Sequence, residues 1–179
     1  TKAKQFDERP VDLIRIFRVA LDAGMEIHPK TLQTITQKAR LVLSRHLPDN
    51  VEANAVFLDI LTHKRNPLET LRLMNDTSVL GYLLPEFGAV VGMMQFNRYH
   101  HYTVDEHTFR AVGVMHRIAA DDGDDGMGRA SSVFGDIVQT RALYVAMLLH
   151  DLMKGRGEPR AVRGAEMAKT VAPRMGLTE

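Results

Sequence analysis

Residues 141–157 read RALYVAMLLHDLMKGRG, an apolar run that ends in the dipeptide His150-Asp151. A run this apolar predicts a buried helix. Ionisable side chains are rarely buried unless they are paired or bound to a metal. An imidazole and a carboxylate at the end of such a helix therefore need a partner. A divalent metal ion held by both is one explanation, and a structural pair that caps the helix end is the alternative.

The composition excludes several classes of protein. The chain has 179 residues, of which 45% are hydrophobic and 25% charged, enough for one good core or two small ones. Its formal net charge of +1 argues against a nucleic-acid partner. The absence of cysteine excludes thiolate metal sites and fits a reducing compartment, so we expect a cytoplasmic protein. No apolar stretch approaches the roughly 18 residues of a membrane span, so no membrane partner is expected.

Helical spacing of apolar residues recurs along the chain and predicts an all-α fold. Pro10 is expected to open a helix that Gly24 ends, and Pro29 to open the next. Asp49 or Asn50 is expected to cap a third helix.

Further short helices are expected between residues 66 and 84, where Pro85 closes the pattern. Residues 89–96 fit a short strand, a helix or a turn. Thr103 and Glu106 have the spacing of a capping box at the start of another helix. Beyond it, helices are expected near residues 133–138, over the apolar run and after Gly157.

His107 lies near the start of the helix that follows the capping box, on the side of Ala111 and Val114, and is expected to face inward. Residues 121–126 are acidic and glycine-rich and predict a solvated loop, because they lack the ligand order of a calcium-binding loop. Residues 85–88 are the expected joint between a helical linker segment, 1–84, and a second unit, 85–179, with the two packed together.

Several stretches resemble a known family. A helical His followed by a His-Asp pair and a Lys resembles the HD-domain metal-dependent phosphohydrolases. Residues 99–108 (YHHYTVDEHT), 141–144 (RALY) and 150–157 (HDLMKGRG) resemble the PII uridylyltransferase/uridylyl-removing enzymes more closely. Residues 56–61 and 80–96 resemble the helical segment that links the nucleotidyltransferase domain of that family to its HD domain. The resemblance implies an HD-domain helical bundle preceded by a linking segment.

The resemblance also implies a reaction, the hydrolysis of the phosphodiester that joins UMP to a tyrosine of the PII signalling protein. It implies Mg²⁺ or Mn²⁺ as cofactor, which suits imidazole and carboxylate ligands. His107, His150 and Asp151 are the expected metal ligands. Asp151 and Lys154 are the expected catalytic residues, and Lys154 and Arg156 are expected to hold the substrate phosphate. Glutamine is the expected regulator of the longer parent enzyme.

The chain departs from this family after Gly157, where the family reads Gly-Asp-His-Ser and this chain has Glu158-Pro159-Arg160-Ala161. Arg160 cannot bind a metal because it stays protonated. HD domains take a last Asp ligand from a helix further downstream, so the second unit is expected to be truncated at its C-terminus. The alternative is a catalytically degenerate helical scaffold that positions neighbouring domains or docks PII. Hydrolysis of nucleotides or cyclic dinucleotides is a third, weaker possibility.

The other histidines are expected to have no part in a metal site. His100 and His101 are expected to pack in a loop or line a cleft. The remaining four are expected to be solvated on polar faces: His28, His46, His63 and His116.

Overall fold

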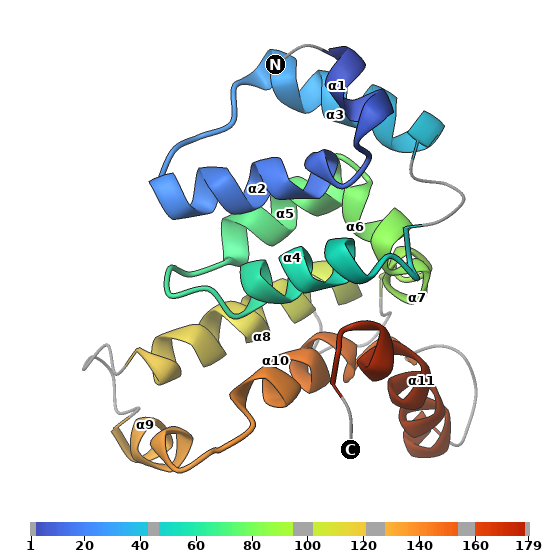
Figure 1. Ribbon diagram of the computed structural model, residues 1–179. Helices are drawn as coiled ribbons and strands as arrows, with labels where there is room; N and C mark the ends of the chain where they lie inside the picture. The colour runs from blue at the N-terminus through green and yellow to red at the C-terminus, as the bar shows by residue number, and fades with distance from the viewer. Residues whose placement is uncertain (1–2, 43–46, 95–101, 121–127, 154–159, 178–179) are drawn as a thin grey trace.

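The computed structural model describes residues 3–42, 47–94, 102–120, 128–153 and 160–177. These residues form eleven helices and no strand, which confirms the predicted all-α class (Figure 1). The helices are α1 (Ala3–Glu8), α2 (Asp12–Ala23), α3 (Pro29–Val42), α4 (Val51–Leu61), α5 (Leu68–Asp76), α6 (Val79–Leu83), α7 (Pro85–Gly88), α8 (Val104–Ala119), α9 (Gly128–Gly135), α10 (Thr140–Leu149) and α11 (Arg160–Arg174).

The helices stack from one end of the molecule to the other, with α1 and α3 at one end and α9, α10 and α11 at the opposite end (Figure 1). Between them α2, α4, α5 and α8 bury their apolar sides against one another. The buried apolar side chains form one continuous core from Phe6 to Met175. None of the described helices combines the length and apolarity that crossing a bilayer requires.

Helix α2 confirms its predicted C-terminal end and corrects its predicted start. Gly24 ends α2 with a left-handed φ of 63°, as predicted, and its N–H bonds back to carbonyls of the last turn. The predicted start at Pro10 was wrong, because α2 begins at Asp12. Pro10 instead lies in a tight turn, in which its carbonyl accepts from the Leu13 N–H at 3.0 Å. This turn allows the unpredicted helix α1 to bury Phe6 in the core.

Other helix starts agree with the sequence to within a few residues. Asn50 caps α4, because its side-chain oxygen accepts from the Ala53 N–H at 2.9 Å. The helix expected near residues 133–138 is α9, which begins earlier, at Gly128, and ends at Gly135. Apolar spacing therefore located these two helices, although it did not set their ends.

Residues 85–94 do not follow the prediction that Pro85 closes a helical pattern. Pro85 instead begins the short helix α7, which packs directly on α6. An alanine Cβ at Gly88 would lie only 3.1 Å from the Gly81 Cα, so any larger residue here would push α6 and α7 slightly apart. Residues 89–94 form turns and no strand, with Gly92 at a φ of 68°. The strand alternative is therefore wrong for these residues.

The two parts expected on either side of residues 85–88 pack together, as predicted. Arg72 of α5 donates through Nε to Glu106 of α8 at 3.0 Å. Asn75 of α5 donates to Asp105 of α8 at 3.1 Å. The buried apolar residues of both parts belong to the same core. The division into units 1–84 and 85–179 stays a prediction.

Two histidines expected to be solvated, His63 and His116, are buried, and the prediction for them was wrong. The His63 Nε2 lies 2.9 Å from Asp22 Oδ1, and its Nδ1 accepts from the Arg65 N–H. The His116 Nε2 lies 3.2 and 3.1 Å from the carbonyl oxygens of His63 and Lys64. Together these bonds hold the α4–α5 loop against α2 and α8. His28 is exposed as expected, while His46, His100 and His101 lie outside the described residues.

Candidate metal centre

Helices α8 and α10 run antiparallel and pack against each other (Figure 1). The first turn of α8 and the last turn of α10 therefore lie at the same end of the pair. His107 is in that first turn, and His150-Asp151 directly follows the last residue of α10. The buried side chains Tyr144, Val145, Leu148 and Leu149 fix α10 in this position.

The three residues predicted as metal ligands come together in space. The Nε2 atoms of His107 and His150 each lie 3.3 Å from Asp151 Oδ2. One ligand atom from each residue lies within 4.8 Å of the other two. The carboxylate oxygen thus lies within reach of both imidazole nitrogens.

The three side chains differ in exposure in a way that suits a cation. The Asp151 side chain is only 10% exposed, whereas those of His107 and His150 are 42% and 38% exposed. The carboxylate therefore lies below two imidazoles that are open to solvent. A buried carboxylate favours a nearby positive charge, because the protein interior screens the attraction less than water does.

The His150 ring is oriented by its own helix. Its Nδ1 lies 2.6 Å from the Met147 carbonyl oxygen. Because a carbonyl can only accept, Nδ1 is the donor in this contact, and Nε2 is the ring nitrogen that faces Asp151. This arrangement is typical of metal-binding histidines, in which the second ring nitrogen donates to a carbonyl or carboxylate. The last four carbonyls of a helix lack helical partners, so a histidine at the end of α10 was the only sequence signal for this bond.

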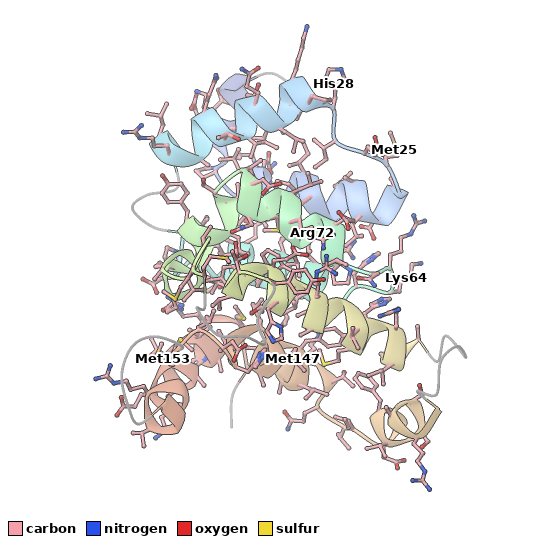
Figure 2. All side chains as sticks on the ribbon, turned by 180° about the vertical axis from the view of Figure 1, so that it is seen from behind. Met25, His28, Lys64, Arg72, Met147 and Met153 are labelled. Carbon is pink, nitrogen blue, oxygen red and sulfur yellow. The ribbon has the colours of Figure 1, made fainter. Side chains whose placement is uncertain are left out.

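The turn that carries His107 is fixed to α5 by charged side chains (Figure 2). Arg72 of α5 donates through Nε to Glu106 at 3.0 Å, and Arg110 donates to the same carboxylate at 2.6 Å. The hydrogen bond from Arg72 holds the pKa of Glu106 below its ordinary value. The Arg110 guanidinium lies 4.1 Å from the centre of the Tyr102 ring.

The predicted capping box is only half right. Thr103 occupies the N-cap position of α8, but its side chain makes no capping bond. The second half of the box does not form either, because the Glu106 carboxylate pairs with Arg72 and Arg110 rather than with the helix end. The preceding Asp105 is buried and accepts from the Asn75 Nδ2 at 3.1 Å.

Not every predicted site residue can be placed. Lys154, Arg156 and Pro159 lie outside the described residues, and Arg160 is described only as the first residue of α11. Their expected roles stay predictions from the sequence.

The donor set of the cluster fits a small divalent cation. When two ligand atoms bind one metal ion at a right angle, with bonds of about 2.1 Å each, the two ligand atoms lie about 3.0 Å apart. Each of the two distances from Asp151 Oδ2 to an imidazole nitrogen is 3.3 Å, close to this value. Two imidazoles and a carboxylate suit Mn²⁺ and other borderline ions as well as Mg²⁺.

Comparison with known proteins places these features in a family context. Residues 1–83 match the family model described as the uridylyltransferase GlnD third domain. The chain is 45% identical over 175 residues to the bifunctional uridylyltransferase/uridylyl-removing enzyme of Azospirillum brasilense, covering 98% of this chain and 19% of that protein. It is 42% identical over 174 residues to the enzyme of the same name from Rhodospirillum rubrum, covering 97% of this chain and 18% of that protein. This chain and a segment of those enzymes are homologous. It spans about a fifth of the length of these curated relatives.

Proposed function

We propose that this chain carries the uridylyl-removing activity, the metal-dependent hydrolysis of the phosphodiester that joins UMP to a tyrosine of the PII protein. The observation that carries the proposal is the convergence of His107, His150 and Asp151, with one ligand atom from each within 4.8 Å of the others. The name of the two relatives, which includes uridylyl removal, supports the choice of reaction. Two half-exposed imidazoles above a buried carboxylate leave the cluster accessible to a substrate from solution.

His107, His150 and Asp151 would hold Mg²⁺ or Mn²⁺. Such an ion neutralises phosphodiester charge and lowers the pKa of a bound water. The protein contributes position: the Met147 carbonyl fixes the tautomer of His150, and the ion pair of Arg72 with Glu106 fixes the turn that carries His107. The Asp151 carboxylate accepts a hydrogen bond from the attacking water and orients it. Lys154 and Arg156 hold the phosphate oxygens, as the sequence predicts.

The test is a pair of measurements on the wild type and on matched variants. Calorimetric titration with Mn²⁺ should show binding that His150→Ala and Asp151→Ala abolish, while His28→Ala, which removes an exposed histidine elsewhere, retains it. Uridylylated PII incubated with the protein and Mn²⁺ should release UMP. Equal Mn²⁺ binding by all four proteins would reject the metal site.

A second candidate function is the helical scaffold with a degenerate centre, which positions neighbouring domains or docks PII. Pro159 and Arg160 favour it, because they stand where the resembling family has Asp and His. Under this function the protein binds Mn²⁺ weakly or not at all, and uridylylated PII stays intact at high Mn²⁺. Steady release of UMP excludes the scaffold.

A further inference from the structure

An apolar groove of about 680 Å³ lies between α8, α9 and α10. It adjoins the three candidate metal ligands His107, His150 and Asp151, which we call the metal cluster. Its lining includes Ala111, Val114 and Ile118 of α8, Val133 and Phe134 of α9, and Met147 of α10. No residue of α9 is fully buried. Phe134 packs edge-on against Tyr144, whereas Val133 is 63% exposed and leaves part of the groove open to solvent.

The groove begins next to the metal cluster on both long helices. Ala111 follows His107 by one helical turn, and Met147 precedes His150 by nearly one turn. Met147 (labelled in Figure 2) belongs to both features. Its side chain lines the groove, and its carbonyl oxygen lies 2.6 Å from the His150 Nδ1. A substrate bound at the cluster can therefore extend into the groove without leaving the surface of the protein.

The length of the groove fits a short stretch of polypeptide. Along α8 the distance from His107 is about 6 Å at Ala111 and about 16 Å at Ile118, at the helical rise of 1.5 Å per residue. The intervening distance of roughly 10 Å is covered by about three residues of extended chain.

The chemistry of the lining favours a polypeptide over a nucleoside. A base and a ribose need hydrogen-bond partners, whereas the lining side chains are apolar with the exception of Arg129. The Arg129 guanidinium has no acidic partner among the described residues. It supplies a positive charge for a carboxylate on a peptide whose apolar side chains fill the groove.

We propose that this groove binds the polypeptide on the tyrosine side of the phosphodiester, through apolar side chains and one carboxylate. The inference rests on the proposed function and deepens it. Under this proposal Val133, Met147 and Arg129 make the protein prefer diesters attached to a polypeptide over small diesters in solution.

The test compares Val133→Glu with Val138→Glu. These valines are 63% and 95% exposed, so neither substitution disturbs the core, but only Val133 lines the groove. Each protein is assayed with uridylylated PII and with bis(4-nitrophenyl) phosphate, a diester too small to reach along the groove. We expect Val133→Glu to lower the ratio of kcat/KM for PII to kcat/KM for the small diester at least about tenfold, mainly through KM. Val138→Glu should keep the wild-type ratio. The same ratio in both variants overturns the inference.

A binding measurement separates this inference from the proposed function. Calorimetric titration with uridylylated PII in EDTA needs no hydrolysis, and Val133→Glu should weaken the affinity about tenfold relative to Val138→Glu. If it does so while the wild type releases no UMP, the groove stands and the proposed function fails. Equal affinities, or no binding by the wild type, overturn the groove. A wild-type dimer that Val133→Glu converts to a monomer in sedimentation would assign the groove to a second copy and also overturn it.

Discussion

The buried histidines His63 and His116 differ from the half-exposed His107 and His150 in what their ring nitrogens contact. The ring nitrogens of the buried pair form hydrogen bonds within the fold, to Asp22, the Arg65 N–H and two carbonyl oxygens. The half-exposed pair directs both Nε2 atoms at the carboxylate of Asp151. A histidine whose nitrogens meet protein partners holds the fold together, whereas converging nitrogens above a carboxylate form a place for a cation.

The largest effect should come from replacing a histidine of the metal cluster. His107→Gln or His150→Gln should weaken Mn²⁺ binding roughly a hundredfold or more. Losing a residue that only hydrogen-bonds a metal ligand typically costs about 10- to 100-fold, and losing the ligand itself should cost more. The free energy of unfolding without metal should change by no more than about 0.5 kcal/mol, because both rings are partly exposed. Calorimetric titration and urea denaturation measure the two quantities. A large loss of stability with intact Mn²⁺ binding would assign these rings to the fold.

The buried pair should show the reverse pattern. His116→Leu keeps the size of the side chain but leaves the His63 and Lys64 carbonyls without their donor, so the free energy of unfolding should fall by about 2 kcal/mol. Urea denaturation checks this value, with Val138→Leu at a 95% exposed position as the control. Mn²⁺ binding should be retained. The comparison breaks if His116→Leu removes metal binding without a loss of stability.

His63→Ala should cost less than His116→Leu, about 1–2 kcal/mol, because its partner Asp22 lies on the surface and can be hydrated instead. Thermal denaturation of the two single variants and the double variant measures this effect. Since His116 bonds to the His63 carbonyl, the double variant should lose less than the sum of the single losses. Strict additivity would contradict a shared network.

The smallest effect concerns the turn that carries His107. Glu106→Gln should lower the free energy of unfolding by about 1 kcal/mol at pH 7, since a partly exposed ion pair contributes little more. The hydrogen bond from Arg72 lowers the pKa of Glu106 in the folded protein. Its contribution is therefore complete above the ordinary glutamate pKa and is lost as the pH falls through the lower folded value. The difference between wild type and variant should vanish in acid, as urea denaturation at several pH values can show. A difference that grows on acidification would contradict the assignment.

Local patterns carried much of the information in the sequence. Helix caps depend on residues a few positions apart. Gly24 was predicted correctly for that reason, and Asn50 is one of the two caps, Asp49 or Asn50, that the sequence offered. The three residues of the metal cluster were predicted from motifs in two distant segments, and the antiparallel packing of α8 and α10 brings them together. Their role as ligands stays a prediction.

The features that the sequence did not show depend on distant partners. His116 lies at a position that looks polar along α8, and only its contact with the α4–α5 loop buries it. Glu106 has the spacing of a capping box, but its carboxylate pairs with Arg72, which lies on another helix. The groove depends on where α9 lies relative to α8 and α10, which periodicity within one helix cannot specify.

The acceptor that orients His150 is a main-chain oxygen, and this has a consequence for variation at position 147. Any residue that keeps α10 helical presents the same carbonyl to the ring, whatever the shape of its side chain. Substitutions such as Met147→Leu or Met147→Phe can thus reshape the groove while the tautomer of the neighbouring histidine is preserved. The shape of the groove and the orientation of the His150 ring can therefore change separately, although Met147 contributes to both.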